Sequence, residues 1–435
     1  MADDRLQVVE SPGPYVYFVL SAFAITLLVG PLLGIILWAS RSGIAFPERQ
    51  PALIQAHGWT QLVGWSGLFV AGFSLRLLPR FAGREEKSAR ISLILLATLV
   101  AGIVLRLVGS MFEGSIEELA IVGEMVTAVG ILGVTLRQVA ILRSNRNVGA
   151  PWALLAWMGA AWWGLWALLT VVGAAASAGS ATVPYGLDRA TVWAVTLGAI
   201  GNFIWAVQSR MMPVSFGRGV LSRTAVLVPA LVYNLGAGVA LIAGLGRYSD
   251  RLTAVWPVVR TGGLGLAGAG MILLAWTCGA LSGQPSRLRP ASQPLARFIL
   301  WANRWAAAGG ALLVLLSVRN LLPAAVARLD LEDAALHALA VGLFTMLIAG
   351  MLQLVAPVFA MQRMGRQSQQ RFARLVWALL MATTLTRVLA ALVPSLFAPL
   401  AGLSGLSGWL GLALLARALT QARGATRSAS VQQAG

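Results

Sequence analysis

Long apolar segments recur through this sequence and constrain its fold more than any other feature. Of the 435 residues, 58% are hydrophobic and only 11% are charged. About 20 apolar residues in a helix cross the ~30 Å hydrocarbon core of a bilayer. Backbone polar groups in lipid must bond within the protein, and apolar segments this long and continuous satisfy them as helices. The sequence therefore predicts an all-α integral membrane protein.

Twelve such segments can be placed along the chain as membrane-spanning helices. We predict spans 1 to 12, in order, at residues 15–39, 51–78, 91–112, 117–142, 151–176, 188–213, 221–245, 252–281, 296–320, 332–360, 371–393 and 397–420. Arginine-rich loops follow every even-numbered span, whereas the other connections are acidic or nearly neutral. By the positive-inside rule, this asymmetry predicts that both termini are cytoplasmic.

The formal net charge of +18 does not indicate a nucleic-acid partner. A nucleic-acid-binding protein gathers its basic residues on one face or domain, whereas the arginines here are scattered through short loops. The single cysteine, Cys278, excludes an internal disulfide and a thiolate metal cluster. Composition therefore predicts the lipid bilayer, and no nucleic acid, as a partner.

Three of the predicted spans resemble one another in sequence. Residues 55–83 in span 2 align with residues 191–217 in span 6 and with residues 335–357 in span 10. Glycines and prolines match across the alignment, and Gly64 aligns with Gly342. Because internal repeats fix an architecture, we predict three related units of four helices around a pseudo-threefold axis.

The three units form one transmembrane domain in this interpretation. They cover approximately residues 15–142, 151–281 and 296–420, within a single domain at residues 1–420. Many twelve-helix transporters instead consist of two six-helix halves, and the sequence gives no such match. Residues 421–435 are polar and predict a disordered cytoplasmic tail.

The chain contains only two histidines, His57 and His337. They lie near the starts of spans 2 and 10, which run in the same direction, so at ~1.5 Å per residue both lie at similar depth in the outer half of the bilayer. An ionisable residue inside a membrane indicates a functional site by default. Two neutral imidazoles suit an iron in a planar macrocycle, one on each axial side. The alternative for either residue is a neutral ring bonded to a carbonyl or hydroxyl, and two histidines alone do not make a closed zinc site.

Residues near the histidines suit a flat, acidic cofactor. Gly64 and Gly342 follow the histidines on their helices, where a missing Cβ would let a ring approach the backbone; close helix packing is the alternative. Three arginines, Arg106, Arg260 and Arg387, lie within spans toward the outer half and could pair with heme propionates. Glu124, also inside a span, is an alternative partner for one of them.

The stretches that begin at the two histidines resemble two signatures of the NnrS family. The family comprises membrane proteins of the nitric-oxide response that are distantly related to heme-copper oxidase subunit I. The matching residues are His57, Gly64, Gly67, Ala71, Gly72, Phe73, Leu75, Pro79 and Gly83 in the first signature and His337, Ala338, Leu339, Val341 and Gly342 in the second. By this resemblance, His57 and His337 are the axial ligands of one low-spin heme b, and the chain resides in the bacterial cytoplasmic (inner) membrane.

The sequence also departs from these patterns at positions that matter for chemistry. Ala335 stands where the superfamily has the histidine of its high-spin heme, and no histidine remains for the three copper ligands of helices 6 and 7. Trp59 and Thr60 stand where the NnrS pattern has a second histidine and a glutamate. The resemblance therefore implies one bis-histidine heme without a binuclear catalytic centre, and it gives no support for copper.

Two classes of function follow from these observations. The first is a heme b-binding membrane protein that acts in the nitric-oxide or nitrosative-stress response, with nitric oxide as its ligand, or in electron transfer to an unidentified redox partner; a turnover enzyme is not expected. The second is a cofactor-free transporter or channel, in which polar residues within the spans line a path. A structural subunit of a respiratory complex is a third alternative. The residues of the second alternative are Arg106, Glu124, Asn202, Gln208, Asn234, Gln353 and Arg387.

Overall fold

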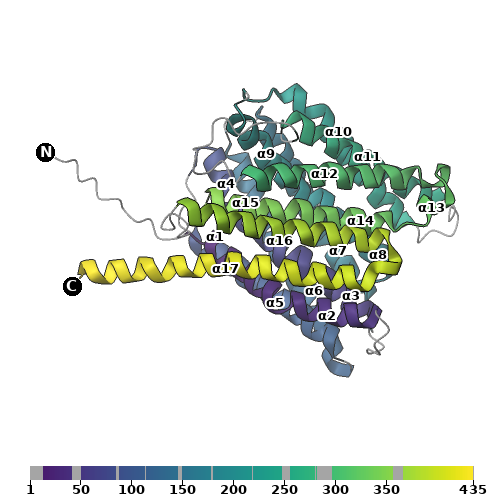
Figure 1. The fold of residues 1–435 in the computed structure, drawn as a ribbon, viewed down its shortest axis with the longest axis horizontal. Helices are drawn as coiled ribbons and strands as arrows, with labels where there is room; N and C mark the ends of the chain where they lie inside the picture. Colours follow the sequence, from purple (N-terminus) through teal and green to yellow (C-terminus); the bar gives the residue numbers. More distant parts are fainter. Residues whose placement is uncertain are drawn as a thin grey trace.

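The described residues of the computed structural model form a bundle of long helices (Figure 1). The structure describes residues 13–434 apart from 42–49, 85–87, 113, 146–148, 178–179, 218, 247–254, 280, 282–295 and 356–365. Within these ranges there is no β-strand. Twelve helical segments are long and apolar enough to cross a membrane, as the sequence predicted.

Nine of the twelve spans are α-helical and contain no π-helix within the described residues. They are α1 (Tyr15–Leu28) continued by α2 (Gly30–Arg41), α5 (Ala89–Met111), α6 (Glu118–Arg143), α7 (Pro151–Ala176), α10 (Arg223–Gly246), α11 (Val255–Thr277), α12 (Ala296–Ser317), α16 (Arg366–Leu392) and α17 (Phe397–Ala434). Short helical turns occur in the connections, at η2 (Gly114–Glu117), η6 (Arg319–Leu321), α13 (Ala324–Ala327) and η9 (Pro394–Leu396).

Spans 2, 6 and 10 share a different construction, because each contains eight residues of π-helix. Their elements are α3 (Gln50–Trp59), η1 (Thr60–Gly67) and α4 (Leu68–Phe81); α8 (Tyr185–Trp193), η3 (Ala194–Gly201) and α9 (Asn202–Ser215); and α14 (Leu331–His337), η7 (Ala338–Thr345) and α15 (Met346–Val355). The π-helical segments occupy the same positions in the alignment of the three spans. Wide turns of this kind are rare and often accompany functional sites. The pseudo-threefold arrangement of whole four-helix units stays a prediction.

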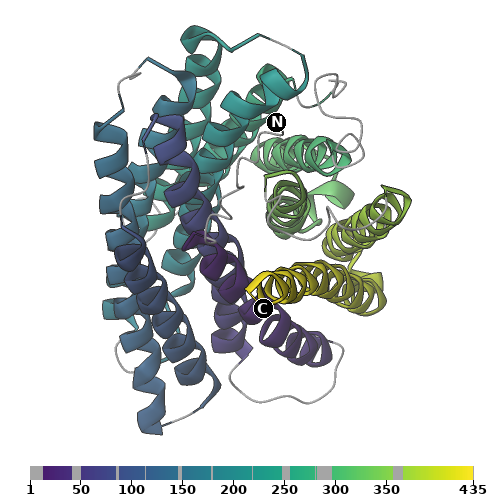
Figure 2. The ribbon, with the colours of Figure 1, turned by 90° about the vertical axis from the view of Figure 1, so that its left-hand side faces the viewer.

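These three spans also form the centre of the bundle. In their most apolar windows 94%, 83% and 78% of residues are buried, against 22–50% in the other spans. The π-helix η1 contacts both η3 and η7. The first and last spans are neighbours, because α17 packs against α1 and α2 (Figure 2).

Small residues set the closest helix contacts in the outer layer. A Cβ added at Gly109 of α5 would lie 2.2 Å from the amide nitrogen of Ala120 in α6. A Cβ at Gly236 of α10 would likewise lie 2.2 Å from the amide nitrogen of Ala267 in α11. Helices in lipid gain from van der Waals contact between backbones that small residues permit. These glycines therefore join consecutive spans into tight pairs.

Several predicted boundaries differ from the structure. The helix of span 8, α11, ends at Thr277, before the predicted residue 281, whereas the predicted start of span 8 at residue 252 and the predicted end of span 10 at residue 360 lie outside the described residues. Residues 421–434 form the end of α17, which projects beyond the bundle (Figure 1), and the predicted disorder of this tail stays a prediction. This segment contains no proline and is rich in alanine, arginine and glutamine, which favour helix.

Candidate functional site

The two histidines occupy near-equivalent positions in the central spans, two residues apart in the alignment, which places His57 opposite Ala335 and His337 opposite Trp59. His337 is the last residue of α14, and His57 lies two residues before the end of α3, so each stands where an α-helix passes into a π-helix. At the position in span 6 that aligns with His57, the hydroxyl of Thr191 donates to the carbonyl of Leu187. The middle span therefore has the same backbone construction without an imidazole.

The fold brings the two histidines to one place. The π-helices η1 and η7, which follow the two histidines, are in contact, and His337, Arg387 and Asp333 lie within electrostatic range of His57. Farther along the same two spans, the buried Nε1–H of Trp65 donates to Oγ1 of Thr345 at 3.0 Å. This bond joins η1 to η7 directly and fixes the relative depth of the two spans.

Asp333 supports the imidazole of His337. Nδ1 of His337 lies 2.9 Å from the main-chain oxygen of Asp333 and 3.3 Å from its carboxylate oxygen Oδ1. The other carboxylate oxygen accepts from Nη2 of Arg387 at 2.9 Å. With two acceptors at Nδ1, the hydrogen-bond network assigns the proton to that nitrogen and leaves the Nε2 lone pair free.

The surroundings of His57 are different. Its Nδ1 is buried and has no hydrogen-bond partner within the described part of the chain. Its main-chain oxygen accepts a hydrogen bond from the hydroxyl of Thr60 at 3.0 Å. The two imidazoles are therefore alike in position and unlike in support.

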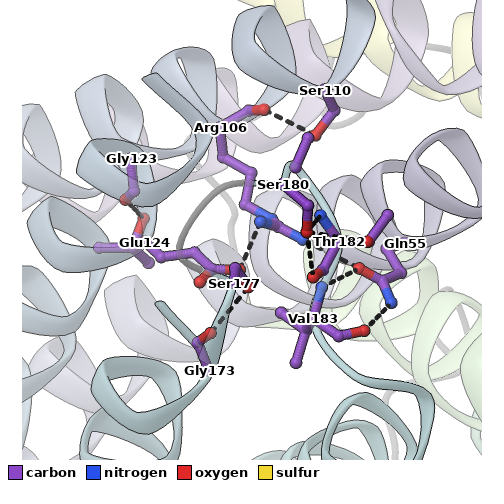
Figure 3. Close-up of polar contacts among 12 residues, drawn as sticks. Gln55, Arg106, Ser110, Gly123, Glu124, Gly173, Ser177, Ser180, Thr182 and Val183 are labelled. Carbon is purple, nitrogen blue, oxygen red and sulfur yellow. Dashed lines mark hydrogen bonds and ion pairs between the residues drawn. The ribbon is translucent and has the colours of Figure 1, made fainter. Parts of the chain in front are cut away.

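Arg106, one of the three predicted propionate-binding arginines, is paired with a carboxylate deep in the protein. It forms an ion pair with Glu124, and both side chains are only 2% exposed (Figure 3). Its guanidinium also lies 5.2 Å from the ring of Trp59 and 3.5 Å from Oε1 of Gln55. The side-chain amide of Gln55 donates through Nε2 to the main-chain oxygen of Val183 at 2.7 Å and accepts at Oε1 from the main-chain N–H of Val183 at 2.9 Å. Glu124, the alternative partner that the sequence suggested, is thus the carboxylate that pairs with Arg106.

Arg260 is also neutralised by a carboxylate of the chain. Its Nη1 donates to Oε2 of Glu332 at 3.1 Å, and its Nη2 donates to Oε1 of the same carboxylate. Glu332 accepts further bonds from Arg189 at 3.0 Å and from Nε1 of Trp193 at 2.8 Å. This carboxylate ties α14 to α8 and α11 near the start of span 10.

Arg387, like Arg106 at Nε, has a buried donor nitrogen with no hydrogen-bond partner among the described residues. Nη2 of Arg387 bonds Asp333, whereas Nη1 is the unpartnered nitrogen. Of the three arginines, Arg387 is the one whose carboxylate partner, Asp333, also contacts His337.

The two predicted glycines pack against neighbouring helices. A Cβ at Gly64 would lie 2.7 Å from the side chain of Ile25, and one at Gly342 would lie 2.5 Å from the side chain of Trp305. Close helix packing, the alternative given by the sequence, accounts for both positions in this structure. Contact of these glycines with a cofactor stays a prediction.

The two carboxylates that pair with Arg260 and Arg387 were not identified from the sequence. Asp333 and Glu332 were not among the predicted site residues, yet they bind Arg387 and Arg260, respectively. A signal was present for Asp333, because it precedes His337 by four residues and therefore lies on the same helix face. No such local signal connects Glu332 to Arg260, which comes from another helix.

Comparison with known families agrees with the histidine signatures. The model of a family described as "NnrS protein" matches residues 15–422. The chain belongs to the NnrS family. No curated protein matches the sequence of this family member.

The fold of this NnrS protein is shared with a terminal oxidase. A heme-copper terminal oxidase whose dimer was solved by cryo-electron microscopy matches with a TM-score of 0.70 and 13% sequence identity. The match covers 95% of this chain and 84% of the oxidase chain. At this identity the likeness establishes the heme-copper oxidase-like fold, and the chain is a multi-pass membrane protein.

Polar residues of the transporter alternative are largely occupied by one another. Asn202 and Asn234 exchange two hydrogen bonds of 2.9 and 3.0 Å, and Trp162 donates to Asn234 at 2.8 Å. Gln208 accepts from Asn303 at 2.7 Å. Paired amides hold membrane helices together, and these pairs join α9 to α10 and α12.

Proposed function

We propose that this NnrS protein binds one heme b between His57 and His337 and acts in the nitric-oxide response or in membrane electron transfer. The observation that carries the proposal is the convergence of the only two imidazoles of the chain at equivalent α-to-π junctions of two packed central spans. Bis-histidine ligation needs one imidazole on each axial side of the iron. The family resemblance supports the nitric-oxide role.

The bonding of His337 fits a heme ligand. Metal-bound histidines usually donate the other ring N–H to a carboxylate or backbone carbonyl. Asp333 offers both kinds of acceptor to Nδ1 of His337 and leaves Nε2 for iron. His57 contributes an imidazole whose buried Nδ1 has no hydrogen-bond partner among the described residues.

Arg387 is the residue that we expect to bind a propionate. Its free Nη1 is a buried cationic donor, which costs free energy unless an acceptor is supplied. A propionate would supply that acceptor. All three predicted arginines have carboxylate partners in the chain; we select Arg387 because its partner Asp333 also contacts His337.

The chain supplies binding and electrostatics, whereas the heme supplies one-electron redox chemistry and a site for small gases. The two histidines are the whole imidazole content of the sequence, so a second heme with a copper partner has no histidine ligands. We do not propose a turnover enzyme.

The proposal also includes a location. Twelve spans and arginine-rich loops after the even spans support insertion in the bacterial inner membrane with both termini in the cytoplasm. The histidine pair then lies toward the outer face. The redox partner is unidentified.

The test is an absorption spectrum of the full chain purified after expression with ample heme. We expect a Soret band and a sharp reduced α-band typical of six-coordinate heme b. His57→Ala and His337→Ala should each abolish the six-coordinate spectrum. Thr191→Ala, at the aligned position of span 6, is the matched control and should leave it unchanged. A colourless wild-type protein would overturn the proposal.

A further inference from the structure

We propose that the two histidines are functionally unequal: His337 is the permanent ligand, and His57 gives up its place to a small diatomic ligand such as nitric oxide. The inference rests on the proposed heme function and deepens it. It assigns gas binding to the face of the iron that His57 occupies.

The bonding of His337 makes it the stronger electron donor. Its Nδ1–H has a main-chain acceptor at 2.9 Å and a carboxylate oxygen at 3.3 Å. A carboxylate beside the distal N–H of a ligating imidazole raises the basicity of the ligand and fixes the orientation of its ring. The carboxylate is itself held in place by Arg387 at 2.9 Å. His337 is therefore aligned toward iron before binding.

His57 has none of this support. Its Nδ1 is buried and makes no hydrogen bond to any described residue. Buried polar atoms are normally bonded, and an unpaired one costs free energy in the folded protein. The ring lacks both the added basicity and the fixed orientation that Asp333 gives to His337. Its bond to iron is consequently the weaker of the two.

The helix that carries His57 stays fixed when the ring moves. Gln55, two residues earlier, bonds both the amide and the carbonyl of Val183, and Trp59 stacks beneath Arg106. Displacement is thus a rotation of the imidazole about its own side-chain bonds. With a heme bound, this rotation would release Nε2 of His57 from the iron and let the diatomic bind in its place, a ligand exchange in which no electron is gained or lost.

The test uses carbon monoxide as the probe on the reduced full-length protein in detergent. Asp333→Asn removes the carboxylate charge next to His337, and Asp330→Asn is the matched control. Asp330 caps α14 by accepting from the amide of Asp333 at 3.0 Å, and asparagine caps equally well. The readout is the iron–carbon stretch of the carbon monoxide complex by resonance Raman spectroscopy.

With His337 opposite the gas, Asp333→Asn should raise this frequency, because a weaker ligand on the far side strengthens the iron–carbon bond. Asp330→Asn should leave it unchanged. No response to Asp333→Asn would overturn the inference. So would failure of the reduced wild type to bind carbon monoxide while its six-coordinate spectrum persists, and that outcome leaves the proposed heme function standing.

A second variant keeps the test decisive if Asp333→Asn does not fold. His57→Ala should retain five-coordinate heme on His337 and bind carbon monoxide without prior ligand loss. For an open wild-type form populated at about 1%, the variant should bind about 100-fold more tightly. His337→Ala should lose its heme. The reverse pattern, heme lost with His57→Ala and kept with His337→Ala, would show that the histidines have the opposite roles.

Discussion

Glu124→Ala should destabilise the protein far more than the double substitution Arg106→Leu with Glu124→Leu. The ion pair of these two residues joins α5 to α6, and each side chain is 2% exposed. Removing Glu124 alone leaves the guanidinium buried without its counter-charge. Replacing both residues removes the unpaired charge together with the pair.

The size of the effect follows from the burial. Breaking a buried ion pair by removing one partner costs about 3–5 kcal/mol, whereas exchanging the whole pair for apolar residues is often neutral. Gln55 and Trp59 also contact the guanidinium, yet neither carries a charge that could replace Glu124. We therefore expect a loss of about 3–5 kcal/mol in the single variant and a much smaller one in the double.

The assay is reversible unfolding of the detergent-solubilised protein, followed by tryptophan fluorescence. A double-mutant cycle with Arg106→Leu gives the coupling energy of the pair. Glu118→Ala, at the start of the same helix, controls for loss of a carboxylate from α6. Equal destabilisation by the single and double substitutions would refute the reasoning, because it would mean that the isolated arginine finds water or lipid headgroups at no cost.

Three further predictions concern helix packing, the site and topology. Gly236→Ala should separate α10 from α11 and lower the melting temperature, because the new methyl group would meet the backbone of Ala267 at 2.2 Å; Gly238→Ala, whose methyl group meets nothing within 4 Å, should be neutral or stabilising. Trp65→Phe should cost about 1 kcal/mol of unfolding free energy through loss of the bond to Thr345 and should weaken heme retention on dilution, whereas unchanged heme retention would show that this bond does not align the histidines. A reporter fused after residue 435 that is active only in the cytoplasm should be active, and activity of a periplasmic reporter there would reverse the topology.

The sequence could reveal the parts of the site whose signals are local. Hydropathy is a property of single segments, so twelve spans could be predicted without knowing how they pack. The alignment of spans 2, 6 and 10 placed His57 and His337 within two residues of each other, and the structure has π-helices at the same aligned positions in all three spans. Scarcity also helped, because two histidines in a long apolar chain leave few interpretations.

Other features depended on how helices rotate against their neighbours, which hydropathy does not encode. The carboxylate partners of Arg106 and Arg260 come from other spans. All three arginines that the sequence suggested as propionate ligands form ion pairs with carboxylates of the chain. The difference between a supported His337 and an unsupported His57 is likewise tertiary. Composition thus determined a membrane protein with one pair of imidazoles. Only the packing of α14 against α16, with Asp333 and Arg387 between them, decided that the two imidazoles are not equivalent.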